Sequence, residues 1–175
     1  MIEIRKAKIS DLSGIIEVAE SAFEHEYNKE NLDLIKKLFL EKITSRFKDI
    51  YVSVDNEKVV GYAIYGPILL TGTFELYQIG VKKEQREKGI GTWLLKESLQ
   101  RYSNSLKELG IDLYACYLTT SSDNPAGQKL YEKAGFKHTG EIRDSFIGKG
   151  NVEIIMASFF SDRKYPEGKL WDKEK

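Results

Sequence analysis

Apolar positions along the chain follow the two spacings that are typical of strands and helices. Near the N-terminus, Ile2 and Ile4 alternate with charged residues, which predicts a strand with one buried face. Helical spacing then predicts two helices on either side of the polar stretch 24–28. Their apolar positions are Leu12, Ile15, Ile16, Ala19, Ala22 and Phe23 in the first and Ile35, Leu38, Phe39, Ile43 and Phe47 in the second.

The middle of the chain is dominated by strand patterns. Short apolar runs over residues 50–54 and 58–66 flank Asp55-Asn56-Glu57, which predicts a hairpin whose second strand ends at Gly66-Pro67. Residues 75–81 are apolar and aromatic and predict a buried strand. A helical stripe follows and is expected to end at Gly110, with the apolar positions Leu95, Leu99, Tyr102, Leu106 and Leu109.

The C-terminal part adds a strand in which Leu113, Ala115 and Tyr117 alternate, a short helix and a closing hairpin over 136–142 and 152–160. The full order, β-α-α-β-β-β-α-β-α-β-β, predicts an α/β fold with a mixed central β-sheet flanked by helices on both faces. Beyond residue 160 the pattern gives way to charged residues. We therefore expect one domain over residues 1–160 and a polar C-terminal tail over 161–175.

Composition narrows the functional classes. At 175 residues, the chain can bury one sizeable core. Its 27 basic and 27 acidic residues are balanced, so we expect no nucleic-acid partner. The single cysteine, Cys116, excludes an intrachain disulfide and fits a reducing compartment. With a polar N-terminus and no apolar run near ~18 residues, a cytoplasmic protein without a membrane partner is expected. We expect the protein to be a monomer or a homodimer.

The connection after the strand at 75–81 is the main candidate for a binding site. It consists of Arg86-Glu87-Lys88-Gly89-Ile90-Gly91 and leads into the predicted helix. A helix N-terminus presents unpaired N–H groups and the positive end of the dipole, so it attracts anions. Glycines give phosphates access to the backbone, and Arg86 and Lys88 add positive charge. The segment therefore predicts a site for a phosphorylated ligand, with an ordinary glycine-bearing turn as the alternative.

The spacing of these glycines excludes two common phosphate motifs. The nucleotide-hydrolase loop requires Gly-x-x-x-x-Gly-Lys-Ser/Thr, which is absent. The dinucleotide fingerprint requires a third glycine where this chain has Leu94.

What remains, Arg86-x-x-Gly89-x-Gly91 after a strand, resembles the coenzyme A pyrophosphate loop of the GNAT N-acetyltransferase superfamily. A later stretch resembles the second signature of that family: Asn124 opens a short helix, Tyr131 follows seven residues on, and Gly-Phe begins the next strand. The family usually has Ala three residues after the asparagine, whereas this chain has Gly127, a change that we expect to be conservative in size. The resemblance spans most of residues 1–160.

The resemblance implies an N-acetyltransferase that transfers the acetyl group of acetyl-coenzyme A to a primary amine by direct attack in a ternary complex. The acceptor stays open between a polyamine, an amino acid or a similar small molecule and an amino group of a protein or peptide. One alternative is a non-catalytic acyl-coenzyme A sensor or regulatory module, which would keep the loop but would need neither Glu75 nor Tyr131. Another is a structural α/β module of a larger assembly.

The resemblance also assigns site residues. Glu75 is expected to be the general base, with water alone as the alternative, and Tyr131 the general acid, with an ordinary core tyrosine as the alternative. In the family, the link between the first two helices overhangs the acceptor site, so His25, Glu26 and Tyr27 are expected to touch substrate unless they form a solvated turn. The cofactor is expected at Ile79, Gly80, Val81, Arg86, Glu87, Lys88, Gly89, Ile90, Gly91, Thr92, Asn124 and Tyr131.

Four residues carry further expectations. Gly80 inside a strand permits a bulge or a close approach next to the bound thioester, or it merely relieves crowding. Cys116 has no neighbouring histidine or charge to activate it, so we expect a buried structural thiol rather than an acetyl-cysteine intermediate. His25 and His138 lack metal-ligand spacing, so no metal site is expected.

Overall fold

The computed structural model describes residues 2–23, 32–45, 48–68, 72–144, 150 and 152–160. In chain order these form β1 (Glu3–Lys6), η1 (Ile9–Asp11), α1 (Leu12–Ala22), α2 (Leu32–Thr44), β2 (Asp49–Asp55), β3 (Lys58–Ile68), β4 (Thr73–Val81), η3 (Lys83–Gln85), α3 (Ile90–Glu108), β5 (Ala115–Ser121), α4 (Pro125–Lys133), β6 (Lys137–Arg143) and β7 (Val152–Phe159). The order of helices and longer strands is the one that the hydrophobic pattern predicts.

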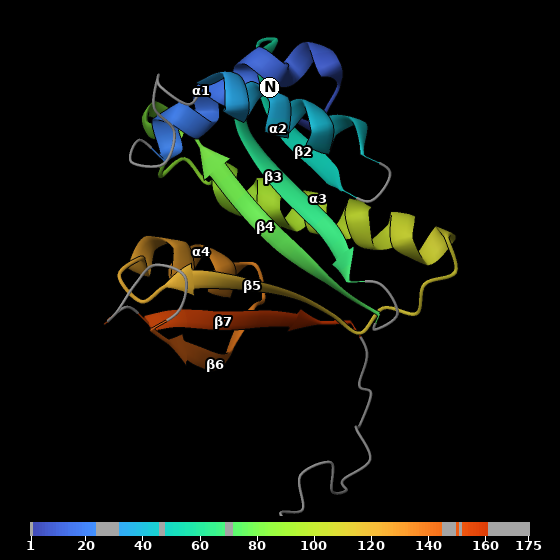
Figure 1. The fold of residues 1–175 in the computed structure, drawn as a ribbon, viewed down its shortest axis with the longest axis vertical. Helices are drawn as coiled ribbons and strands as arrows, with labels where there is room; N and C mark the ends of the chain where they lie inside the picture. The colour runs from blue at the N-terminus through green and yellow to red at the C-terminus, as the bar shows by residue number, and fades with distance from the viewer. Residues whose placement is uncertain are drawn as a thin grey trace, which may run out of the picture.

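The seven described strands form one mixed sheet in the order β1-β2-β3-β4-β5-β7-β6. Neighbouring strands run antiparallel except for β4 and β5, which are parallel. Helices α1 and α2 pack against one face, and α3 and α4 pack against the other (Figure 1). The predicted α/β fold with helices on both faces is therefore confirmed.

The hairpin between β2 and β3 turns where it was predicted. Asn56 and Glu57 both adopt positive φ angles, of 46° and 65°, which a tight two-residue turn between twisted strands requires. The prediction that β3 ends at Gly66-Pro67 is wrong, because β3 continues to Ile68. Since β2 begins at Asp49, opposite Tyr65, β3 has no β2 neighbour beyond that point. A proline, which cannot donate to a ladder, is tolerated in a strand that lacks a neighbour on one side.

Strand β4 is bonded unequally to its two neighbours. It pairs with β3 from Thr73 to Val81, but it pairs with β5 only from Thr73 to Glu75. Two residues after the last β5 pair, the register against β3 skips Tyr77, so this residue forms a bulge. Because a bulge bends and twists its strand, β4 turns away from β5 here. Figure 1 shows the two strands meeting at one end and spreading apart toward the other.

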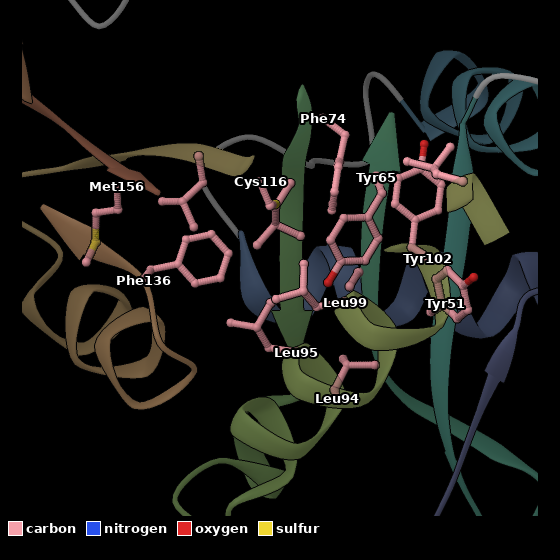
Figure 2. Close-up of a cluster of buried hydrophobic side chains, with 14 of the residues drawn as sticks. Tyr51, Tyr65, Phe74, Leu94, Leu95, Leu99, Tyr102, Cys116, Phe136 and Met156 are labelled. Atoms are coloured by element: carbon pink, nitrogen blue, oxygen red, sulfur yellow. The ribbon is translucent and has the colours of Figure 1, made fainter. Parts of the chain in front are cut away.

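The core continues beneath this divergence. The cluster on the α3 side runs without a break from Tyr51 of β2, past Cys116 of β5, to Met156 of β7 (Figure 2). Within it, the Tyr65 hydroxyl lies 2.8 Å from Ser98 Oγ, and both side chains are fully buried. A second cluster packs α1 and α2 against β2 and β3.

Some sequence expectations differ from the structure. Leu38 is 44% exposed, because Ile35 and Phe39 are the residues of α2 that face the sheet. Leu109 is 76% exposed, because α3 ends one residue before it. In β5 the predicted alternation has the wrong phase, since Cys116 and Leu118 face the larger core cluster. Phe47 and the tail over 161–175 lie outside the described residues. Among the helices that the structure describes, none has the length and apolar character needed to span a membrane.

Candidate active site

A cavity of about 830 Å³ opens where β4 and β5 diverge. This volume is within the roughly 300–1,000 Å³ of typical small-molecule sites. Of the predicted cofactor residues, all but Lys88 and Ile90 line it: Ile79, Gly80, Val81, Arg86, Glu87, Gly89, Gly91, Thr92, Asn124 and Tyr131. The Lys88 ammonium instead donates to Gln85 Oε1 at 3.1 Å, and the Ile90 side chain is buried.

The N-terminus of α3 meets this cavity at Gly89. Gly89 is the N-cap residue, with φ of 80°, and a Cβ built there would have no neighbour within 4 Å. The cap lacks a side-chain hydrogen bond, so the N–H groups of the first turn have no such acceptor. Because the helix dipole adds positive potential at this end, the cavity can bind an anion against the backbone.

Gly91 lines the cavity, and its missing side chain also allows two helices to pack closely. A Cβ at Gly91 would lie 2.7 Å from Leu130 Cδ1 of α4 and 3.5 Å from Val81 Cγ2 of β4. The absence of a side chain therefore lets α3 pack closely on α4. Gly89 is the glycine whose missing side chain leaves open space.

Arg86 links the loop by hydrogen bonds to two neighbouring elements. Its Nε donates to the Val81 carbonyl at 3.2 Å, and one terminal nitrogen reaches the Ala22 carbonyl at 3.5 Å. The guanidinium thus joins the end of β4 to the end of α1 while it lines the cavity. Two further cations, Lys129 and Lys133, also line the cavity. Sequence reasoning missed them, although their four-residue spacing places them on one face of the helix that follows Asn124.

The open edge of β4 presents backbone groups to the cavity. The N–H of Lys82 donates to the Val60 carbonyl of β3 at 3.0 Å, so this backbone group points toward β3. Because these groups alternate in direction along a strand, those of Ile79 and Val81 point away from β3 and toward the gap. The carbonyl of Val81 accordingly accepts from Arg86.

Gly80 is a point of close approach rather than of bulging. A Cβ there would lie 3.1 Å from the Phe23 ring and 3.3 Å from the Ala22 Cβ, both at the end of α1. The bulge lies at Tyr77 instead. The missing side chain of Gly80 therefore makes room for α1, which fits the alternative that Gly80 relieves crowding, and a role at the bound thioester stays a prediction.

Glu75 lies at the point where the strands separate. It pairs with Tyr117 in the last step of the β4–β5 ladder, and the Tyr117 hydroxyl donates to Glu75 Oε2 at 3.0 Å. Burial and the negative charge of Glu75 raise the pKa of Tyr117 to about 12, so this phenol keeps its proton at neutral pH. Sequence reasoning missed Tyr117, because the alternation seemed to place it on the core face of its strand.

Tyr131 reaches the cavity from α4. Its ring packs edge-on against Phe136, with 6.2 Å between the centroids. Burial raises the pKa of Tyr131 to about 12. Its hydroxyl has no hydrogen-bond partner among the described residues, so the proton can be given to a group bound in the cavity.

Asn124 caps α4 as expected, since its Oδ1 accepts from the Gly127 N–H at 3.0 Å. Its amide nitrogen donates to Thr120 Oγ1 at 3.2 Å. A Cβ at Gly127 would lie 2.8 Å from Asn124 Cγ. Alanine at this position would therefore displace the cap in its present conformation, so the glycine is more than a neutral change in size.

Other candidates stand apart from the cavity. Cys116 is fully buried, and burial raises the pKa of its thiol, as a structural cysteine would have it. His138 is a surface residue, with Nε2 at 3.9 Å from Glu141 Oε1. Within the described ranges, no three His, Cys, Asp or Glu side chains are grouped to hold a metal ion. His25, Glu26 and Tyr27 lie outside the described residues.

Comparison with known proteins identifies the family to which the chain is similar. Residues 12–136 match the model of the acetyltransferase (GNAT) family. The spermidine N(1)-acetyltransferase of Thermoplasma acidophilum is 29% identical over 164 residues, which cover 87% of this chain and 98% of that protein. The L-methionine sulfoximine/L-methionine sulfone acetyltransferase of Pseudomonas paraeruginosa is 26% identical over 148 residues, or 79% of this chain and 82% of that protein.

A solved structure of an N-acetyltransferase has a similar fold. The PaiA N-acetyltransferase of Thermoplasma acidophilum, in complex with coenzyme A, superposes with a TM-score of 0.68 at 25% identity. The match covers 91% of this chain and 99% of that one.

Proposed function

This chain belongs to the GNAT acetyltransferase family, and we propose that it transfers the acetyl group of acetyl-coenzyme A to a primary amine, small molecules being the first acceptors to test. The reaction class, acetyl-coenzyme A-dependent N-acetylation, comes with the family. The acceptor class and the site residues are the new parts of the proposal.

One observation carries the proposal: the cavity beside the open edge of β4 ends at the uncapped N-terminus of α3. Its volume, its backbone donors and its cations fit a long ligand with a diphosphate, and the related PaiA protein has coenzyme A bound. Residues around Gly89 would hold the phosphates, with Arg86, Lys129 and Lys133 adding positive charge. Ile79 and Val81 would bond the ligand's amide-bearing arm as a neighbouring strand would.

Bound acetyl-coenzyme A supplies the thioester whose acetyl group is transferred. Glu75 accepts the proton that the amine loses, directly or through water. Tyr131 holds a proton on its hydroxyl at neutral pH and donates it toward the departing sulfur. Direct attack in a ternary complex is favoured over an acetyl-cysteine intermediate, because Cys116 is buried and burial raises the pKa of its thiol.

The acceptor is proposed from two considerations. The named activities of the relatives concern spermidine and methionine sulfoximine or sulfone, which are small molecules that carry a primary amine. In this chain, the carboxylate of Glu75 favours a cationic group near the site of transfer. A peptide or protein amino group is the other class to include in a test.

The test is a thiol-release assay with acetyl-coenzyme A and a panel of amines: spermidine, methionine sulfone, other amino acids and a peptide with a free N-terminus. We expect turnover with at least one small amine and intersecting initial-rate plots, as a ternary complex requires. Coenzyme A at 100 times its Kd should also add about 2.7 kcal/mol to the free energy of unfolding. Stabilisation without thiol release would favour the sensor, and the absence of both would favour a structural module.

A further inference from the structure

The contact between Tyr117 and Glu75 gives the site a residue that neither signature contains. The Tyr117 hydroxyl donates to Glu75 Oε2 at 3.0 Å, across the last paired step before β4 and β5 separate. We propose that Tyr117 is a positioning residue, which holds one carboxylate oxygen of Glu75 so that the other is presented to the acceptor amine. The proposal rests on the role of Glu75 as general base in the function proposed above.

The geometry explains why the chain needs such a residue. Glu75 is the last β4 residue with a β5 partner, and Tyr77 bulges two residues later, so the strand changes direction immediately after the carboxylate. A glutamate has three side-chain torsions, and on a bending strand they would be poorly fixed. A charge-assisted hydrogen bond from the neighbouring strand removes that freedom. Its donor comes from a ladder pair, which is a rigid support.

The direction of the hydrogen bond is also fixed. Burial and the charge of Glu75 raise the pKa of Tyr117 to about 12, so the phenol is the donor and the carboxylate the acceptor throughout the neutral range. Other titratable groups that interact with Glu75 are Tyr77 on its own strand and Cys116 on β5, and the Lys48 ammonium lies 4.9 Å from the centre of the Tyr77 ring.

Tyr77 offers a matched control. It lies on the same face of β4 as Glu75, because its ring contacts the position of Gly66, the β3 partner of Glu75. Within the described residues its hydroxyl makes no hydrogen bond to Glu75. Tyr77→Phe therefore removes a phenol from the same surroundings without removing the contact.

The experiment compares wild type, Tyr117→Phe, Glu75→Gln, the double variant and Tyr77→Phe. Removing a hydrogen bond to a carboxylate should lower kcat by about tenfold, while the KM for acetyl-coenzyme A stays at its wild-type value. Coenzyme A affinity should not change. In the Glu75→Gln background, Tyr117→Phe should cause no further loss of kcat, and Tyr77→Phe alone should leave kcat near its wild-type value.

Three outcomes would overturn the proposal: a wild-type kcat in Tyr117→Phe, an equal loss when Tyr117→Phe is added to Glu75→Gln, or wild-type turnover in Glu75→Gln. The last would remove Glu75 as the base while acetyl transfer itself stands. If wild type releases no thiol with any amine, the proposed function fails, and the crystal structure of Tyr117→Phe still decides the positioning role. A carboxylate of Glu75 that leaves its wild-type position supports that role, and one that keeps it contradicts the role.

Discussion

The two edges of β4 show how one strand serves both stability and binding. Against β3 it is paired from Thr73 to Val81, whereas against β5 the pairing stops at Glu75. The bulge at Tyr77 follows the last β5 pair, and beyond it β4 is paired with β3 alone. The site is thus formed by ending a ladder early rather than by hollowing the core, which continues beneath the gap (Figure 2).

This difference divides the expected effects of substitutions. Residues on the open side of β4 should affect ligand binding and turnover while the free energy of unfolding changes little. Residues on the closed side should affect the free energy of unfolding while binding and turnover persist. The predictions below test that division.

The largest effect is expected at the start of α3. Gly89→Glu places a carboxylate where the ligand's phosphates are proposed to bind, so coenzyme A affinity should fall by roughly 100-fold or more. Isothermal calorimetry measures this loss. Gly110→Glu is the control, because Gly110, at the other end of the same helix, has nearly the same φ angle, 79° against 80°, and equally open surroundings. Equal affinities of the two variants would contradict the proposed phosphate site.

The next largest effect is expected at Tyr131. Tyr131→Phe removes the hydroxyl that would protonate the departing sulfur, so kcat should fall by roughly 10²-fold. Coenzyme A affinity should be preserved, because the ring still fills its place against Phe136. Steady-state kinetics beside calorimetry separate the two quantities. Turnover at the wild-type rate would reassign Tyr131 to the core.

On the side of β4 that is paired with β3, Tyr65→Phe in β3 should change the free energy of unfolding and leave turnover unchanged. The variant loses the hydrogen bond between the Tyr65 hydroxyl and Ser98 Oγ, at a cost of about 1 kcal/mol in the free energy of unfolding. Ser98 keeps its bond to the Leu94 carbonyl, at 2.6 Å, so its hydroxyl is not left unpaired. Urea denaturation measures the loss. A large fall in kcat would show that the two sides of β4 are coupled.

The last prediction concerns the dependence of stability on pH, and it leaves the free energy of unfolding unchanged near neutral pH. Burial raises the pKa of Tyr51, Tyr117 and Tyr131 to about 12, above the value near 10 of an unfolded chain. Between these values the native state binds more protons than the unfolded state. This contribution to stability is therefore complete below about pH 10 and is lost as the pH rises toward 12. Tyrosinate absorbance measures it, and titration of all tyrosines near pH 10 in the folded protein would contradict it.

The features that sequence alone could predict are local. The order of elements, the turn at Asn56 and Glu57, and the stop at Gly110 depend on neighbouring residues, and all are found. The glycine loop belongs to this group, since a helix start and its N–H groups are specified within one turn. The exposed Leu38 and Leu109 were placed wrongly, because periodicity cannot tell whether Leu38 or its neighbour Phe39 faces the sheet, or at which residue a helix ends.

The features that sequence could not predict depend on register. Tyr117 meets Glu75 from 42 residues away, through the pairing of two parallel strands. The bulge at Tyr77 has no glycine to mark it, and the glycine that is present, Gly80, serves to accommodate α1. The roles of His25, Glu26 and Tyr27 in acceptor binding stay predictions.

The bulge at Tyr77 also bears on self-association. A strand that has lost its neighbour can template the addition of a strand from another polypeptide, which is a common route to aggregates. Adding such a strand requires evenly spaced backbone donors and acceptors, and a bulge breaks that spacing and twists the edge. The irregularity that opens β4 to a small ligand therefore also makes it a poor template for a foreign chain.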